Sequence, residues 1–372
     1  MMSTTGLRNS PLILLCAGGT GGHLFPAQAA AVALKKRGAR IALATDERVE
    51  RYSGDFPAES THVIPSATLR GRSPLAYART ATMLGLGLAK SWSLLGKLKP
   101  AAVVGFGGYP TVPPLKAAML RGIPTLLHEQ NSVMGRANRM LAPRVTAIGS
   151  SFNEIALLDP VLKSKVTLVG TPVRPNVIAA AGTRYEPPRA NDTLRLIIFG
   201  GSQGAKVFAD VMPDAIALLD LALRNRLSIV QQVRGEDRGR VRTSYEKSGI
   251  EAEVADFFTD LPARVADSHL VVSRSGASTV AEVTAIGRPA IFVPLPNALD
   301  QDQLNNARVV ERAGGAVILE QPDFTPQRVA AELKSLLADS DRLGRMAARA
   351  RSVGVLDGSE RLAELVMKVA GI

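Results

Sequence analysis

The chain has 372 residues, of which 46% are hydrophobic and 21% are charged, a balance typical of a globular protein with two domains of ordinary size. Its single cysteine, Cys16, excludes an internal disulfide bond and favours a reducing compartment. The formal net charge of +12 favours an anionic partner, but an aromatic content of only 4% argues against a nucleic-acid-binding protein that stacks bases on aromatic side chains.

The first predicted unit is a buried strand, Leu12–Cys16, that leads through a glycine-rich turn into a helix over Ala27–Leu34. The turn reads Ala-Gly-Gly-Thr-Gly-Gly-His-Leu-Phe-Pro over residues 17–26. Glycines allow the backbone to approach a ligand closely, and N–H groups at the start of a helix favour an anion. His23 lies in this turn, and histidine is the side chain whose pKa is closest to neutrality. We therefore interpret it as a candidate catalytic residue.

Strands and helices alternate through the rest of the first half, which predicts a parallel sheet. Polar or glycine-rich motifs follow two of its strands: Gly105–Pro110 after Ala101–Val104, and His128-Glu129-Gln130-Asn131 after Pro124–Leu127. Parallel sheets bind ligands at the carboxyl ends of their strands, so these motifs and the first turn should face one crevice. The other expected elements are strands over Arg40–Thr45 and residues 62–64 and a long helical region over Pro74–Leu98.

The second half restarts this pattern after a break at Val169–Pro175, where we place a domain boundary. A strand over Leu194–Phe199 enters the glycine-rich turn Gly200–Ala205 and another helix. The sequence therefore predicts an α/β protein of two Rossmann-like, doubly wound domains that face each other across a cleft.

A dense polar region follows strand Leu270–Ser273. Ser278 or Thr279 is expected to cap the next helix and leave backbone N–H groups to a phosphate. Glu282, one turn further, offers two oxygens to the two hydroxyls of a ribose. After a strand over Pro289–Val293, a helix from Asp300 carries polar side chains that suit a sugar.

Other nucleotide and metal sites are not supported by the spacing. A dinucleotide fingerprint would need glycine at position 24, which is Leu24, and no Gly-Lys-Ser/Thr triplet follows a glycine loop. The four histidines and one cysteine form no cluster with the spacing of metal ligands.

A membrane-facing patch is predicted on Pro74–Leu98. Between Ser60 and Asn153 the chain has eleven Lys and Arg residues and one acid, Glu129. One face of the helical region is expected to pack on the sheet, namely Tyr77, Ala81, Leu84, Leu88, Trp92 and Leu95. The outward patch consists of Arg79, Met83, Leu86, Lys90 and Lys97, and would attract an anionic leaflet. The sequence has no stretch of about 18 uncharged apolar residues that could span a membrane, and Leu12–Leu15 is too short for a secretory signal.

Five motifs in this order resemble those of the bacterial peptidoglycan N-acetylglucosaminyltransferases, which convert lipid I to lipid II. They are Gly18–His23, Gly107–Tyr109, His128–Asn131, Gly200–Ala205 and Arg274–Ala277 with Glu282. The resemblance implies a GT-B fold and inverting transfer from UDP-N-acetylglucosamine, a substrate, to the 4-hydroxyl of undecaprenyl-pyrophosphoryl-MurNAc-pentapeptide, with no metal or other cofactor. It also implies peripheral attachment to the cytoplasmic face of the bacterial inner membrane, no nucleic-acid partner, and protein partners in cell-wall synthesis.

The resemblance further implies an N-terminal acceptor-side and membrane-side domain (1–172), a UDP-sugar domain (173–355) and a C-terminal helix within 356–372 that packs on the first domain. The implied donor contacts are Thr20, Gly21, Gly22, Asn131, Arg174, Ser202, Phe258, Ala277, Ser278, Thr279, Val280, Ala281, Glu282 and Gln303. Tyr109 and Asn138 are implied on the acceptor side. His23, Glu129 and His128 are candidates for the general base, whereas His62 and His269 are interpreted as structural. The alternative is another GT-B enzyme that uses a UDP-sugar, either a glycolipid synthase or a UDP-N-acetylglucosamine epimerase.

Overall fold

The computed structural model describes residues 10–18, 21–47, 56–66, 74–201 and 204–372. The chain forms two compact units: Met1–Arg174 with Asp357–Ile372, and Pro175–Leu356. The sequence predicted the corresponding boundaries at residues 172 and 356. Arg174, which the sequence placed in the second domain, belongs to the first unit. Each unit is described by itself.

The first unit contains a seven-stranded sheet in the order β3-β2-β1-β4-β5-β6-β7. Every neighbouring pair is parallel, which confirms the prediction of a parallel sheet. The strands are β1 (Leu12–Cys16), β2 (Arg40–Thr45), β3 (Ser60–Val63), β4 (Ala102–Gly105), β5 (Thr125–Glu129), β6 (Ala147–Ser150) and β7 (Val166–Leu168).

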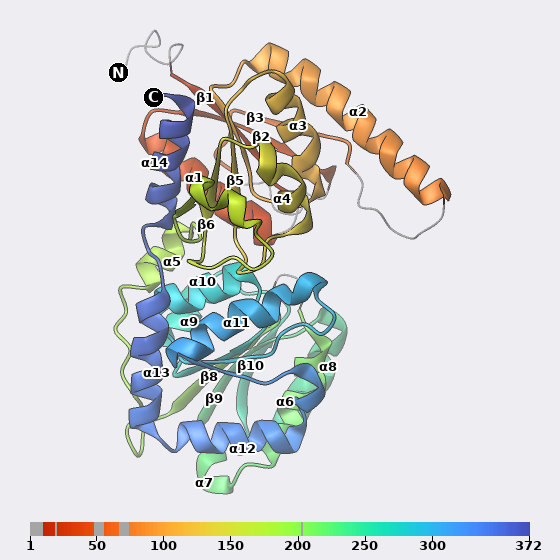
Figure 1. Ribbon diagram of the computed structural model, residues 1–372. Helices are drawn as coiled ribbons and strands as arrows, with labels where there is room; N and C mark the ends of the chain where they lie inside the picture. The colour runs from red at the N-terminus through yellow and green to blue at the C-terminus, as the bar shows by residue number, and fades with distance from the viewer. Residues whose placement is uncertain (1–9, 19–20, 48–55, 67–73, 202–203) are drawn as a thin grey trace. The chain divides into compact units, whose positions relative to one another are not determined.

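Helices cover both faces of this sheet, and for that reason its central strands are apolar on both sides. Ile13 and Leu15 of β1 pack with α1 (Gly21–Lys36) and α14 (Gly358–Ala370), which lie side by side (Figure 1). Leu14 and Cys16 of the same strand contribute to the opposite core, with residues of α2 (Pro74–Leu98), α3 (Val112–Leu120) and α4 (Arg136–Leu141). Short 3-10 helices follow some of these elements: η3 (Tyr109–Thr111), η4 (Ala142–Arg144) and η5 (Pro160–Lys165).

Helix α1 begins earlier than predicted, at Gly21 rather than Ala27, and ends at Lys36. The second glycine pair and His23 therefore form the first turn of the helix, instead of a loop before it. Pro26 lies inside the helix. The predicted stop is confirmed, because Gly38 adopts a left-handed φ of 84° two residues after the last helical residue.

Helix α2 is continuous through Gly85 and Gly87, but its buried face differs from the predicted one. Ser91 and Leu95 are buried, whereas Trp92 is 43% exposed and Ala81 is exposed. Gly87 explains why a different face of α2 is buried, because a Cβ there would fall against the carbonyl oxygen of Pro65 and 3.0 Å from Pro113 Cγ. The glycine lets the backbone of α2 approach its neighbours closely. The prediction that Trp92 and Ala81 pack on the sheet is therefore wrong, and Tyr77 lies outside the described side chains.

The second unit contains a six-stranded sheet in the order β10-β9-β8-β11-β12-β13, again with every neighbouring pair parallel. Its strands are β8 (Leu194–Phe199), β9 (Leu227–Gln232), β10 (Glu251–Ala255), β11 (Leu270–Ser273), β12 (Ala290–Phe292) and β13 (Ala316–Ile318). Its helices are α5 (Pro175–Ala180), α6 (Lys206–Ala217), α7 (Leu221–Arg224), α8 (Arg238–Lys247), α9 (Leu261–Asp267), α10 (Ala277–Ile286), α11 (Asp302–Ala313), α12 (Pro326–Leu337) and α13 (Ser340–Val353), with 3-10 turns η6 (Gly235–Asp237), η7 (Leu299–Gln301) and η8 (Gln321–Asp323).

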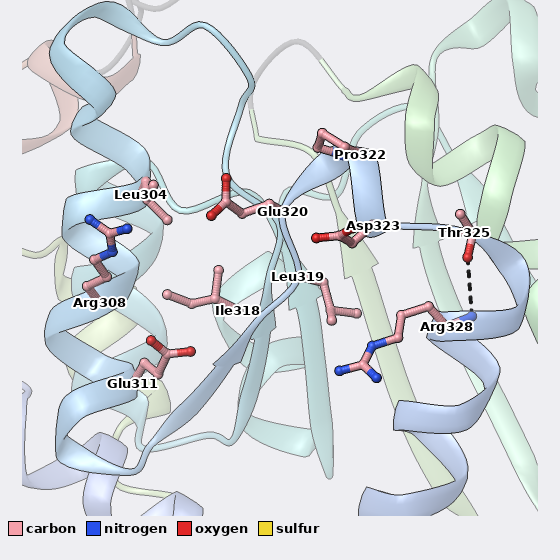
Figure 2. Close-up of a pocket in the computed structure, with 10 residues that line it drawn as sticks. All are labelled: Leu304, Arg308, Glu311, Ile318, Leu319, Glu320, Pro322, Asp323, Thr325 and Arg328. Atoms are coloured by element: carbon pink, nitrogen blue, oxygen red, sulfur yellow. Dashed lines mark hydrogen bonds between the residues drawn. The ribbon is translucent and has the colours of Figure 1, made fainter.

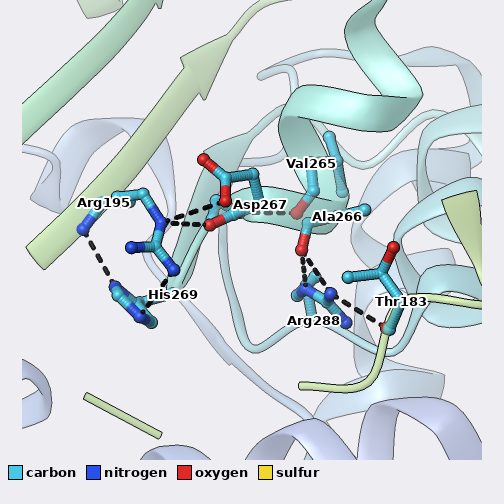
Figure 3. A network of polar contacts seen from close by, with 8 residues as sticks. Thr183, Arg195, Val265, Ala266, Asp267, His269 and Arg288 are labelled. Carbon is cyan, nitrogen blue, oxygen red and sulfur yellow. Dashed lines mark hydrogen bonds and ion pairs between the residues drawn. The ribbon is translucent and has the colours of Figure 1, made fainter. Parts of the chain in front are cut away.

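A buried arginine, Arg288, connects the loop that follows α5 to the ends of α9 and α10. Arg288 is 1% exposed and donates hydrogen bonds to the carbonyl oxygens of Ala266 and, at 3.1 Å, Thr183 (Figure 3). It also donates to the carbonyl oxygen of Ile286. Burial lowers its pKa to about 10. The Tyr185 hydroxyl donates to the carbonyl oxygen of His269, so the segment that follows α5 is held against the start of β11. The imidazole of His269 has a structural contact of its own, because its Nδ1 accepts a hydrogen bond from Arg195 N at 3.0 Å.

Candidate functional site

In each sheet the order in which strands are added reverses beside the first strand. In the first unit β2 lies on one side of β1 and β4 on the other, and in the second unit β9 and β11 flank β8 in the same way. Parallel sheets bind ligands at such a switch point, outside the carboxyl ends of the two strands. The glycine-rich motifs after β1, β4, β8 and β11 therefore occupy the positions where this architecture places a ligand.

His23 is seated on the glycine turn that follows β4. Gly107 and Gly108 adopt left-handed φ angles of 89° and 78°. A Cβ at Gly107 would lie 3.1 Å from His23 Cε1, and one at Gly108 would lie 3.4 Å from His23 Cδ2. These positions need glycine both for their backbone conformation and for the space that the imidazole ring occupies.

Gln130 connects His23 to His128. Its Oε1 lies 3.2 Å from His23 Nδ1, and its Nε2 lies 3.1 Å from His128 Nδ1 and 2.9 Å from the carbonyl oxygen of Phe106. His128 Nε2 lies 3.0 Å from the carbonyl oxygen of Gly170. His128 is fully buried, and this burial lowers its pKa to about 4 despite the bond to Gly170.

Glu129 organises the loop that follows β5. Its carboxylate is 1% exposed and accepts hydrogen bonds from four donors: Asn131 N (3.0 Å), Asn131 Nδ2 (3.4 Å), Gly135 N (3.0 Å) and Asn138 Nδ2 (2.7 Å). Burial raises the pKa of this carboxyl group, and the four hydrogen bonds oppose the rise. Both oxygens are thus occupied in holding residues 131–138.

The remaining predicted residues of the first unit lie near these motifs. Asn138, on α4, is buried against Glu129 through the bond just described, and Tyr109 begins η3 directly after Gly108 and is half-buried. The Arg174 guanidinium stacks on the Phe25 ring of α1 at 4.2 Å. Thr20 and Ser202 lie outside the described residues.

Helix α10 carries the predicted phosphate and ribose contacts from Ala277 to Glu282 in its first turns. Its N-cap is Gly276, which makes no side-chain capping hydrogen bond. The expectation that Ser278 or Thr279 caps this helix is therefore wrong, since both residues lie inside the first turn. The glycine cap still presents the positive end of a ten-residue helix at the switch point of the second sheet.

Gln303 is tied to the loop before α11, and that loop has an unusual backbone. Gln303 Oε1 accepts a hydrogen bond from Leu295 N at 3.0 Å. Asn297, Asp300 and Gln301 adopt left-handed φ angles of 58°, 57° and 53°. Regular helix consequently begins at Asp302 rather than at Asp300, where the sequence placed it. Left-handed backbone costs free energy in residues other than glycine, and such positions cluster at ligand sites.

Phe258 follows β10, with its side chain buried beneath the Arg264 guanidinium at 4.5 Å. This burial leaves its backbone, rather than its ring, as the group that could contact a base.

A separate cavity of about 600 Å³ lies between α11, β13, η8 and α12 (Figure 2). Its lining combines Arg308 and Arg328 with Glu311, Glu320 and Asp323. None of the predicted donor or catalytic residues lines this cavity.

Across the residues that the structure describes, no three His, Cys, Asp or Glu side chains gather in a way that could hold a metal ion. Within the same described residues, no helix has the length and apolarity needed to cross a membrane.

Comparison with known proteins supports the resemblance seen in the motifs. The glycosyltransferase family 28 N-terminal domain matches residues 13–150, and the family 28 C-terminal domain matches residues 195–362. A crystal structure of Acinetobacter baumannii MurG is 27% identical, covers 96% of this chain and 99% of that one, and superimposes with a TM-score of 0.77. The two-domain GT-B fold is thereby confirmed, whereas the cleft between the domains stays a prediction.

Curated relatives carry a more specific name. A protein of Rhodopseudomonas palustris is 59% identical over 98% of this chain and 100% of its own length, and one of Bradyrhizobium is 55% identical over 98% and 99%. Both are named UDP-N-acetylglucosamine–N-acetylmuramyl-(pentapeptide) pyrophosphoryl-undecaprenol N-acetylglucosamine transferase. These matches support the predicted transferase over the glycolipid synthase and epimerase alternatives. The chain belongs to glycosyltransferase family 28, among its N-acetylglucosamine transferases of this name.

Proposed function

We propose that the chain transfers N-acetylglucosamine from UDP-N-acetylglucosamine to the 4-hydroxyl of the N-acetylmuramyl group in undecaprenyl-pyrophosphoryl-MurNAc-pentapeptide. The acceptor oxygen forms a bond to the anomeric carbon, the bond from that carbon to the diphosphate breaks, and the configuration inverts. A general base takes the acceptor proton, and UDP leaves with the electron pair. The observation that carries this proposal is the position of His23 against the glycine turn at the β1/β4 switch point.

His23 is the general base in this proposal. The other two candidates are fully buried and occupied: His128 uses both ring nitrogens, and Glu129 uses both carboxylate oxygens. His23 is half-buried, in the first turn of α1. It combines access to a substrate with a fixed ring orientation, which are the two requirements for a base.

The donor site in this proposal is built on the second unit. The positive end of α10 stabilises the charge that develops on UDP, Glu282 accepts the ribose hydroxyls, Gln303 contacts the sugar and the Phe258 backbone contacts the uracil. Electrostatic stabilisation by helix dipoles and backbone N–H groups takes the place of a metal ion in this scheme. Thr20, Gly21, Gly22, Asn131, Arg174 and Ser202 complete the donor contacts implied by the family motifs, and Tyr109 and Asn138 serve the acceptor.

Attachment to the cytoplasmic face of the inner membrane is the remaining part of the proposal. On α2, Lys90 and Lys97 are exposed, Leu86 is 57% exposed and Met83 is half-buried. The side chain of Arg79 lies outside the described part of α2. Each cation near an anionic leaflet contributes about 1 kcal/mol, so the patch would hold the enzyme loosely beside a lipid-linked acceptor.

Vesicle co-sedimentation tests this patch. A variant with Lys90→Glu and Lys97→Glu should bind anionic vesicles more weakly than the native chain and retain its affinity for UDP. The matched control reverses two exposed cations of the second unit, Arg242→Glu and Arg345→Glu. Equal binding to neutral and anionic vesicles, or equal loss in both variants, would remove α2 from the membrane contact.

Product analysis tests the activity itself. UDP-N-acetylglucosamine labelled in the sugar is incubated with the lipid-linked acceptor, and the label should move into the disaccharide-bearing lipid. Label found in a free epimerised sugar nucleotide, or in a different glycolipid, would refute the proposed reaction.

A further inference from the structure

The side-chain amide of Gln130 can take only one orientation in this structure. The carbonyl oxygen of Phe106 is an acceptor, so the Gln130 atom that lies 2.9 Å from it must be the NH2 group. Gln130 is 2% exposed, and reversing the amide would place two oxygens against each other without solvent to separate them. The amide oxygen therefore faces His23.

The orientation of this amide determines the tautomer of His128. Its Nδ1 receives the second N–H of the Gln130 amide at 3.1 Å, so this nitrogen carries the lone pair. The ring proton is then on Nε2, which donates to the carbonyl oxygen of Gly170 at 3.0 Å. Complete burial and the neighbouring Phe106 ring, whose centroid lies 5.7 Å away, keep this imidazole neutral and fixed.

The same amide determines the tautomer of His23. An amide oxygen can only accept, so the His23 Nδ1 that lies 3.2 Å from it must carry a proton. Turning the imidazole over would place its Cδ2–H, instead of Nδ1, against the Gln130 oxygen and would lose this hydrogen bond. In the neutral ring the lone pair is then on Nε2.

We propose that Gln130 is a positioning residue, which holds the proton of His23 on Nδ1 and thereby assigns the basic lone pair to Nε2. The hydrogen bonds then all donate in one direction: from His23 to Gln130, from Gln130 to His128, and from His128 to the carbonyl oxygen of Gly170. This inference rests on the proposed role of His23 as general base. Without the Gln130 acceptor, a neutral His23 would exchange between two tautomers, and only one of them has its lone pair on Nε2.

Nitrogen NMR of the full-length protein tests the assignment directly. With histidine labelled at both ring nitrogens, long-range proton–nitrogen spectra distinguish a protonated ring nitrogen from one with a lone pair. The four histidines are assigned by single substitutions. We expect His23 to show Nδ1–H and His128 to show Nε2–H, so that the two residues give opposite tautomers. A native spectrum with the His23 proton on Nε2 would overturn the proposal, whatever the variants do.

Two substitutions at Gln130 separate its two roles. Gln130→Leu removes the acceptor, so the Nδ1–H signal of His23 should be lost and kcat should fall roughly tenfold while affinity for UDP stays unchanged. Gln130→Glu keeps an acceptor toward His23 but cannot donate to His128. The His23 signal should remain, the His128 signal should change, and kcat should fall less than in the leucine variant.

Gln231→Leu is the matched control. Gln231 is a fully buried glutamine of β9, and its amide donates to the carbonyl oxygen of Phe208 and accepts from the Tyr245 hydroxyl. It should lose stability without changing the His23 spectrum. An unchanged His23 tautomer in Gln130→Leu would refute the positioning role. If His23→Ala retains turnover, the proposed base fails, while the spectrum still decides the tautomer.

Discussion

Replacing Glu129 with glutamine separates a structural carboxylate from a catalytic one. The native side chain accepts four hydrogen bonds, two on each oxygen. Whichever way a glutamine amide turns, its NH2 group faces two of these donors, so two hydrogen bonds to a charged acceptor are lost. Each contributes about 1.5–3 kcal/mol. We therefore expect Glu129→Gln to destabilise the first unit by about 3–6 kcal/mol.

The chain offers a selective assay for this loss. Trp92 is its single tryptophan and lies on α2 of the first unit, so intrinsic fluorescence in urea reports the unfolding of that unit. The matched control is Glu154→Gln, an exposed glutamate of the same unit, which should change stability by less than about 0.5 kcal/mol. A native urea midpoint for Glu129→Gln, combined with a loss of kcat of about 100-fold and intact UDP binding, would refute the structural role and make Glu129 the base.

Three further predictions concern pH, packing and the donor site. His128 has a folded pKa of about 4 against 6.5 for a free histidine, so its contribution to stability is present above pH 6.5 and falls by about 3 kcal/mol as the pH drops to 4. His128→Gln should flatten the pH dependence of the unfolding transition monitored by Trp92 by that amount, and an unchanged slope would contradict the burial argument. Gly87→Ala should lower the stability of the first unit by about 2 kcal/mol or more, because the added Cβ clashes with Pro65. Gly85→Ala should raise the stability by up to about 1 kcal/mol, because its Cβ meets nothing within 4 Å. Equal effects would show that α2 does not depend on the close approach at Gly87. Calorimetry should show that Glu282→Ala weakens UDP binding by about 1–3 kcal/mol and that Gln303→Ala weakens UDP-N-acetylglucosamine more than UDP, whereas equal losses for the two ligands would exclude a sugar contact by Gln303.

The periodicity of apolar residues was sufficient to predict most of the central strands. The run Leu12–Cys16 is apolar on both faces, and Leu194–Phe199 is apolar apart from Arg195, as is typical of covered parallel strands. The structure places strands at those residues. Several weaker strands were not predicted from the sequence. The outer strand β10, for example, contains Glu251 and Glu253, and its pairing depends on the neighbouring β9 rather than on its own pattern.

A sequence motif indicates a candidate site residue, whereas a role that only a tertiary contact defines leaves no signal in the sequence. The glycines around His23 were evident from the sequence, but the space that Gly107 and Gly108 leave for its ring depends on β4 lying beside β1. Gln130 stood inside a polar motif without a distinguishing feature, because its function depends on three partners up to 107 residues away. A similar limit explains the error on α2, since the position of Gly87 against Pro65 cannot be deduced from helical periodicity.

The central claim, that His23 is the general base, is tested most directly by the turnover of His23→Ala with UDP-N-acetylglucosamine and the lipid-linked acceptor. His62→Ala, a half-buried histidine of the same unit that bonds to Ser60, is the matched control. The account predicts that kcat falls about 100-fold or more in His23→Ala, with affinity for UDP and the Trp92 unfolding midpoint unchanged. Turnover within a few-fold of the native rate would contradict it.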